Sequence, residues 1–305
     1  MRAYVATRLA QTALVVFLSL SAVFFMVRLA GDPVLLFMPM DIQAKDVNEF
    51  RQRLGFNDPL AVQYARFVGG AARGDFGESL RYRRDALGLV LERLPATLLL
   101  ATCAVGLTLV IAVPLGVVTA VRRDTLVDHV GTLVTVIGQA VPGFWLGLMM
   151  IYVFSVQLRW LPTGGVGSLA HLVMPSIVLA AFFSARIARL TRSTLLEALG
   201  EDYVLTARAK GLSEARVLAK HTLRNSAIPI VTLAGLEIGQ LLGGAVITET
   251  IFAWPGLGRL TVQALLNRDF PVVLAAVFVI SVTYTSINLA VDLLYGWLDP
   301  RVRLR

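Results

Sequence analysis

Six long apolar runs constrain this chain more than any other feature of its sequence. They lie at about 9–29, 97–121, 133–156, 172–190, 228–251 and 271–296. Each is close to the roughly 20 residues that a helix needs to cross about 30 Å of hydrocarbon. Backbone polar groups in a bilayer must be satisfied within the segment, and these unbroken runs lack the alternation of barrel strands. The sequence therefore predicts an all-α integral membrane protein with six transmembrane helices.

Composition supports the same class. The mean hydropathy of +0.72, with 56% hydrophobic residues, exceeds what a soluble globular chain normally carries. The first run follows Arg2 and Arg8 and could be mistaken for a cleavable secretory signal. Because it continues through 22–27 to spanning length, we expect a retained N-terminal transmembrane helix over 1–30.

The arginines indicate the orientation of the helices. Short cytoplasmic loops are enriched in Lys and Arg, and most arginines here fall on one side, at both chain ends, at 122–123 and over 186–224. The segment 31–93 also holds many arginines, but it is long enough to cross the membrane regardless of charge. We therefore expect both termini in the cytoplasm. The net charge of +8 mostly reflects this bias, and nucleic-acid binding is disfavoured.

A polar segment at 200–213 separates two of the apolar runs and predicts a short helix over about 201–210. Gly211 suits a left-handed residue that ends this helix, and Ser213 suits the cap of the next one. Charges lie where the helix dipole favours them, acidic in the first turn and basic in the last, at Glu201, Asp202, Arg208 and Lys210. Such a helix can stand at the membrane face and pass force to a soluble partner.

This segment resembles the cytoplasmic coupling segment of binding-protein-dependent ABC importer permeases, whose pattern is Glu-Ala-Ala, three residues, Gly, nine residues, Ile-x-Leu-Pro. Aligned on Gly211, only Ala207, Gly211 and Leu223 match that pattern. The motif Gly-Glu-Asp-Tyr-x-x-Thr-Ala-Arg-Ala-Lys-Gly at 200–211 is similar to the sequences of the dipeptide, oligopeptide, glutathione and nickel branch of the family. Further similar segments are Gly31–Val34, Gly74–Gly77, Phe252–Arg259, Asp292–Gly296 and Asp299–Arg301.

The resemblance implies a type I ABC importer permease fold and a division of the chain. The expected parts are the first helix at 1–30, an external region at 31–93, a permease core at 94–297 and a cytoplasmic tail at 298–305. The external region is either a packing lid or a contact for a solute-binding protein. The residues that the resemblance assigns to ATPase coupling are Glu201, Asp202, Tyr203, Thr206, Ala207, Arg208, Lys210 and Gly211.

The resemblance also implies partners and a location. A homologous second permease, two ABC ATPase subunits and an extracytoplasmic solute-binding protein would complete an importer in a bacterial cytoplasmic (inner) membrane. The ATPase subunits would use ATP and Mg, and this chain would hold no cofactor. The pathway would carry peptides or related small solutes.

The fifth run is unusually polar. Glu237, Gln240 and Gly244 share one helical side and suggest either a substrate path or, for Glu237, a structural pair with an arginine or hydroxyl. Glu249 lies closer to the run's end and suggests a solvated or capping role. Three arginines recur every third residue at the inner end of the fourth run and suggest membrane-side anchors, namely Arg186, Arg189 and Arg192.

A helix-breaking segment follows the fifth run. Its residues Trp254, Pro255, Gly256 and Gly258 suggest an outer gate at the pore mouth, and an interface anchor through Trp254 is the alternative.

Enzyme chemistry finds little support in the sequence. No Walker-type phosphate loop is present, and Lys45, Lys210 and Lys220 are the only lysines that could serve one. The histidines are scattered, which disfavours a metal site, and Ser168 with His171 falls in a short loop where an intramembrane protease is not expected. The other function class is a self-sufficient secondary transporter or channel. That class needs its own ion-coupling groups and often inverted repeats, which the sequence does not show.

Overall fold

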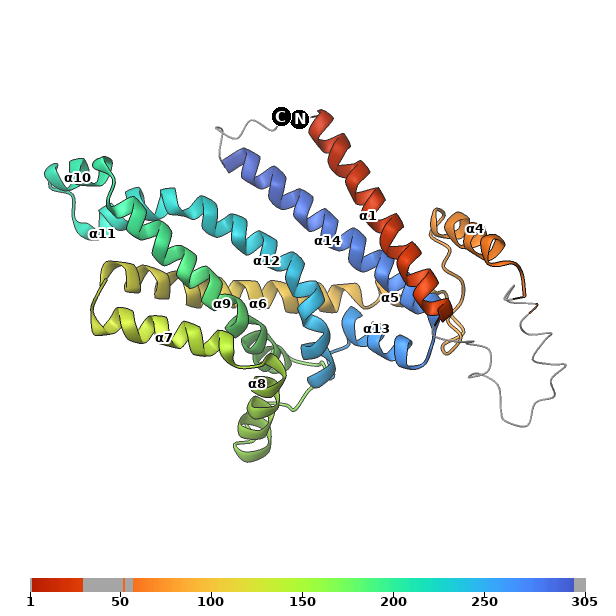
Figure 1. The fold of residues 1–305 in the computed structure, drawn as a ribbon. Coiled ribbons are helices and arrows are strands. Elements are labelled where there is room, and N and C mark those ends of the chain that lie inside the picture. Colours follow the sequence, from red (N-terminus) through yellow and green to blue (C-terminus); the bar gives the residue numbers. More distant parts are fainter. Residues whose placement is uncertain (1, 30–51, 53–56, 299–305) are drawn as a thin grey trace. The chain divides into compact units, whose positions relative to one another are not determined.

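The computed structural model describes residues 2–29, 52 and 57–298, and these residues form helices joined by short loops, with no strand among them. Glu78 and Asp85 make one isolated β-bridge. The helices in Figure 1 are α1 (Arg2–Leu29), α4 (Leu60–Ala71), α5 (Ala86–Leu91), α6 (Leu94–Val121), α7 (Leu126–Ala140), α8 (Gly143–Met150), η1 (Ile151–Gln157), α9 (Ala170–Leu199), α10 (Asp202–Ala209), α11 (Glu214–Arg216), η2 (Val217–Thr222), α12 (Leu223–Ile251), α13 (Leu257–Leu266) and α14 (Phe270–Leu298).

The apolar helices account for the six expected spans. Four are single spans, at Ala6–Met26, Ala86–Val121 (α5 with α6), Ala170–Leu199 and Phe270–Leu294. Two more consist of bent pairs, Leu126–Ala140 with Gly143–Gln157 and Ser226–Leu241 with Ala245–Ile251. Counting each bent pair as one span gives six, and the chain is an all-α membrane protein as the sequence predicts.

The third apolar run differs from the single helix expected over 133–156. The two halves meet at 96°. Val141, which precedes Pro142, is extended with φ −72° and ψ 123°. A residue before proline is pushed out of the helical region, and proline itself cannot donate the next helical hydrogen bond. The Pro142-Gly143 dipeptide therefore turns one apolar run into two helices.

The described chain packs as two compact units that are not contiguous in sequence. One comprises Met1–Ala96 and Gly256–Thr283, and the other comprises Thr97–Pro255 and Tyr284–Arg305. Packing thus joins α13 and the first half of α14 to the N-terminal third of the chain. The contiguous division at 30, 93 and 297 stays a prediction.

In the first unit, α4 packs against α1 through aromatic side chains. The Phe24 ring stacks on Phe67 at 5.0 Å between centroids, and the hydroxyls of Ser21 and Tyr64 lie 2.6 Å apart. The buried Asp269 carboxylate, just before α14, accepts hydrogen bonds from Ser79 Oγ (2.5 Å) and from the Leu80 and Arg81 amides. These bonds fix a loop of the expected external region, whose residues 31–51 and 53–56 lie outside the described chain.

In the second unit, α9 packs against α7, α8 and α12, and it is drawn in green in Figure 1. Helix α6 also lies against it at a glycine. A Cβ on Gly116 would lie 2.6 Å from the Ala188 carbonyl oxygen and 2.6 Å from Thr191 Cβ. Small residues at such crossings let helix backbones approach closely, which is a principal source of packing energy between helices in a bilayer.

This close approach yields a stability prediction with an internal control. Gly116→Ala forces α6 and α9 apart, and we expect it to destabilise the protein by about 1–3 kcal/mol, as overpacking generally does. Gly106 lies in the same helix, and a Cβ added there would meet no atom within 4 Å. Gly106→Ala should therefore leave the unfolding midpoint in detergent unchanged or raise it. Equal midpoints for the two variants would contradict this packing assignment.

Candidate functional site

Helix α10 ends in a Schellman motif built on Gly211. Gly211 has φ +74°, which is the left-handed conformation expected of it. Its amide donates to the Arg208 carbonyl (2.9 Å), and the Leu212 amide donates to the Ala207 carbonyl (3.3 Å). These are the paired bonds of the motif, and Leu212 also packs in the cluster that contains Ala207. The left-handed backbone of Gly211 and these two hydrogen bonds therefore end α10 at this position.

One face of α10 is buried against the chain that follows it. Val204 and Ala207 are buried and pack with Val217 of η2. Of the residues assigned to coupling, Tyr203 is half-buried and Ala207 is buried, and the others are exposed, namely Glu201, Asp202, Thr206, Arg208, Lys210 and Gly211. The sequence reading missed Leu205, which is 58% exposed beside them. The three-residue step from Val204 to Ala207 could have placed Leu205 on the outer face.

A salt bridge joins α10 to α11. Arg208 Nε and Nη2 donate to the two carboxylate oxygens of Glu214 at 2.8 and 3.1 Å, and this bond raises the pKa of the Arg208 guanidinium. Ser213 takes the cap position of α11, but its side chain makes no capping hydrogen bond. The expected N-cap position of Ser213 is thus confirmed without a side-chain bond, and the bond from Arg208 to Glu214 joins the two elements.

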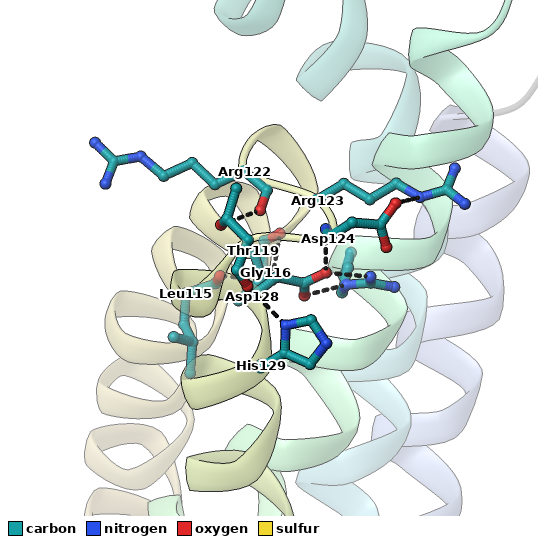
Figure 2. Close-up of polar contacts among 10 residues, drawn as sticks. Leu115, Gly116, Thr119, Arg122, Arg123, Asp124, Asp128 and His129 are labelled. Atoms are coloured by element: carbon teal, nitrogen blue, oxygen red, sulfur yellow. Dashed lines mark hydrogen bonds and ion pairs between the residues drawn. The ribbon is translucent and has the colours of Figure 1, made fainter.

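The three arginines of α9 each contact a specific acceptor rather than acting only as membrane-side anchors. Arg192 donates from Nε and Nη2 to the two oxygens of the buried Asp128 on α7, at 2.8 and 2.7 Å. Figure 2 shows the turn between α6 and α7, where the Asp124 amide adds a third bond to Asp128 (3.1 Å). Asp128 therefore has several donors, and this cluster ties α7 to α9.

The other two arginines, Arg189 and Arg186, make fewer charged contacts than Arg192. Arg189 Nη2 donates to Gln139 Oε1 at 2.7 Å. Arg186 Nη1 donates to Glu237 Oε1 and to Gln240 Oε1, both at 3.1 Å. Glu237 is 1% exposed and lies midway along α12. Glu237 and Gln240 therefore share the α12 side that meets α9.

The glycines of α12 serve a different neighbour. A Cβ on Gly239 would lie 2.9 Å from the Tyr284 ring of α14, and one on Gly235 would lie 2.5 Å from Val291. These glycines let α14 approach closely. Gly244, also predicted on the path, lies in α12 where the structure describes no side-chain surroundings.

The structure contradicts the solvated or capping role predicted for Glu249. It was expected to be solvated or capping, but it is 0% exposed, and Thr97 Oγ1 donates to its Oε1 at 2.6 Å. A buried carboxylate needs such a donor, because leaving it unpaired in an apolar interior is costly. Glu249 therefore ties α12 to the start of α6.

The segment predicted as an outer gate is packed within the protein. Trp254 is 1% exposed, so its ring is covered by the rest of the chain. The Gly165 amide donates to the Phe252 carbonyl (2.8 Å), and Ala253 holds a strained φ of +49°. Pro255 is half-buried, and Gly256 and Gly258 are buried. The geometry describes an ordered segment, and its gating role stays a prediction.

Ser168 and His171 do meet, which the sequence reading did not anticipate. Ser168 Oγ lies 3.0 Å from His171 Nδ1, and the Ser168 amide donates to the same nitrogen at 3.2 Å. The contact joins residues three apart at the start of α9. It is a local contact between neighbouring turns of the chain.

Comparison with known proteins defines the class. The described chain has up to six apolar spans, and the short helix α10 lies between α9 and α12 in the sequence. The profile described as "Binding-protein-dependent transport system inner membrane component" matches residues 112–304, and its N-terminal companion matches residues 1–101. The chain belongs to this family and is an ABC importer permease.

Curated relatives cover almost the whole chain. The "Oligopeptide transport system permease protein AppB" of Bacillus subtilis (strain 168) is 43% identical over 283 residues, which is 89% of this chain and 90% of that protein. The "Glutathione transport system permease protein GsiC" of Escherichia coli (strain K12) is 40% identical over 281 residues, or 92% of each chain.

A solved structure supports the fold. An inward-facing form of the MetNI methionine ABC transporter is similar with a TM-score of 0.56 at 21% identity, over 69% of this chain and 96% of that one. At this identity the likeness speaks for the type I permease fold.

The Asp128–Arg192 pair yields a second prediction. Asp128→Asn leaves the guanidinium of Arg192 without its counter-charge, and we expect a loss of about 2–4 kcal/mol in stability. Arg192→Gln should cost a similar amount. The double variant should cost less than the sum of the two, because both single changes break the same interaction. Unfolding midpoints in detergent measure all three, and full additivity would show that the pair does not hold α7 to α9.

Proposed function

We propose that this permease forms one half of a pathway that imports peptides or related small solutes, with α10 as its docking helix for an ABC ATPase. The observation that carries the proposal is the exposed face of α10. It presents Leu205 between polar and charged neighbours on a short helix whose position is fixed by the Gly211 turn. An apolar side chain rimmed by polar ones is typical of a protein contact surface.

The solute class rests on the relatives. One is described as an oligopeptide permease and another as a glutathione permease. Both kinds of solute carry peptide bonds and free carboxylates. Similarity at 40% or more over nine-tenths of the chain favours a related solute for this protein.

The arrangement of partners follows from the family and from charge. We propose that a second, homologous permease completes the pathway, that two ATPase subunits bind ATP and Mg, and that a solute-binding protein delivers the solute from outside. This chain would hydrolyse no ATP itself. Because short cytoplasmic loops are enriched in Lys and Arg, we propose that α10 and both termini lie in the cytoplasm, where the ATPases would dock.

The connection from α10 to α9 suggests how force is passed on. Only Gly200 and Glu201 separate the end of α9 from the start of α10. Helix α9 is tied to α7 by Arg192 and to α12 by Arg186. Closure of the ATPases would push α10, and α9 would carry its tied neighbours between inward and outward arrangements, as packed elements with two states do.

Reconstitution tests the proposal. Proteoliposomes that contain this permease, its partner permease and the two ATPases should take up labelled oligopeptide or glutathione when ATP and the binding protein are supplied. Omitting the ATPases should abolish uptake. Solute movement by this chain alone, without ATPases, would favour a secondary transporter or channel instead.

Gly211 gives a sharper test of the docking helix. No atom lies within 4 Å of a Cβ added there, so a substitution acts through the backbone alone. Gly211→Val places a β-branched residue at φ +74° and should misdirect α10, so transport should fall at least tenfold with the protein still in the membrane. Asn tolerates this conformation far better, so Gly211→Asn should keep most of the transport. Similar rates for the two variants would sink the assignment.

A further inference from the structure

The face that α9 turns toward α7 and α12 carries more positive than negative charge. Arg186, Arg189 and Arg192 contribute three positive charges, and their contacts include two carboxylates, those of Glu237 and Asp128. Three minus two leaves one positive charge. The excess is local, because Arg192 is matched through both oxygens of Asp128 whereas Arg189 meets only the neutral amide of Gln139.

Arg186 is matched only in part. Its contacts with Glu237 and Gln240 both use Nη1. A guanidinium has five N–H donors, and Nε and Nη2 make no side-chain bond that the described chain shows. The Arg186 side chain is 40% exposed, whereas Glu237 is 1% exposed. The guanidinium is thus held along one edge by a buried carboxylate, and part of it remains open.

The open part of Arg186 cannot face lipid at low cost. A charged group against hydrocarbon is expensive, so arginines within membrane helices normally face a bundle interior or a water-filled cavity. Phe182, one turn along α9, places its ring 5.9 Å from the guanidinium carbon and is itself exposed. An aromatic ring beside an open guanidinium shields it from water on one side and leaves the planar edge for a ligand.

We propose that Arg186, together with Arg189 one turn away, forms a carboxylate-binding site on the wall of the solute path. Its ligand is the carboxylate of a peptide-like solute. The planar fork of an arginine matches a carboxylate geometrically, and Glu237 and Gln240 are positioning residues that hold Arg186 in place. This inference rests on the proposed function, because it assigns a step to the same pathway.

Glu237 gives the site a property that transport requires. A fully unpaired arginine would hold an anionic solute too tightly, whereas a path must bind its solute and also release it. Because Glu237 already satisfies part of the charge of Arg186, the solute carboxylate competes with an internal one. The site therefore binds weakly and favours anions over cations.

A charge-selective labelling experiment tests the site without needing the solute. A Phe182→Cys reporter in a Cys103→Ala background, in the assembled complex, is reacted with a negatively and with a positively charged methanethiosulfonate. We expect the anionic reagent to react several-fold faster relative to the cationic one than at Leu266→Cys, an exposed reporter on α13. Arg186→Gln should remove most of that preference.

The matched control is Arg123→Gln, which removes the same charge from an exposed arginine paired with Asp124 beyond the end of α6. It should leave the preference at position 182 unchanged. An anion preference that survives Arg186→Gln would overturn the proposal. So would a reporter that reacts only with a lipid-soluble maleimide, because position 182 would then face lipid or protein.

A transport experiment tests the ligand class. Uptake of trialanine is compared with uptake of its C-terminal amide, with the same binding protein throughout, so that its own preference cancels between permease variants. Arg186→Gln should lower the acid-to-amide uptake ratio at least fivefold, and Arg186→Lys, which keeps the charge but loses the planar fork, should give a ratio between those of Arg186→Gln and the unmodified permease. An unchanged ratio in Arg186→Gln, with intact ATP-dependent uptake, overturns the site and leaves the proposed function standing.

Loss of ATP dependence in the unmodified complex would instead reject the proposed function, and the labelling result would still decide the site.

Discussion

The need to pair charge within an apolar bundle organises the larger unit of this protein. Helix α9 carries an arginine at every third position through a stretch of otherwise apolar and small residues. An unpaired guanidinium there would cost several kcal/mol, so each one requires an acceptor from a neighbouring helix. Asp128 and Gln139 come from α7, and Glu237 and Gln240 come from α12. The polar contacts thereby set which faces of α7 and α12 meet α9.

Close packing then makes these contacts stiff. Gly116 brings α6 against α9, and Gly235 and Gly239 bring α12 against α14 at distances where no larger residue fits. Interiors packed at this density shift as bodies rather than deform smoothly. Because α10 follows α9 after two residues and is braced by the Schellman turn, a displacement of α10 reaches the bundle through backbone and paired side chains.

Local features of the sequence predicted much of this arrangement, and distant partners explain what it missed. The six apolar runs, the short helix at 202–209 and the left-handed Gly211 depend on neighbours within a few residues. Glu249 was misjudged because its donor, Thr97, lies 152 residues away. The partners of the α9 arginines are likewise 50 to 64 residues distant.

Two features of the structure that were not predicted are nevertheless indicated by neighbouring residues in the sequence. The Pro142-Gly143 pair indicates the 96° bend in the third run, but apolar length outweighed it. Leu205 was not among the predicted coupling residues, although the helical period places its side chain on the exposed side of α10. The roles of the coupling, path and gate residues depend on partner chains, which no pattern within this sequence can position.

The contrast between Arg192 and Arg186 follows from their partners alone. Both are arginines on the same helix, six residues apart, and both reach a buried carboxylate. Asp128 offers both oxygens to Arg192 and receives a further amide, so that pair is closed and serves packing. Glu237 offers one oxygen to Arg186, and its second oxygen, also buried, has no hydrogen-bond partner in the described chain. An incompletely satisfied pair is less stable than a closed one, and it is retained most readily where another group completes it. A passing anion beside Arg186 would accept hydrogen bonds from the guanidinium N–H groups that Glu237 and Gln240 leave open, and only while it is bound, which ties the weakness of this pair to the turnover of the path.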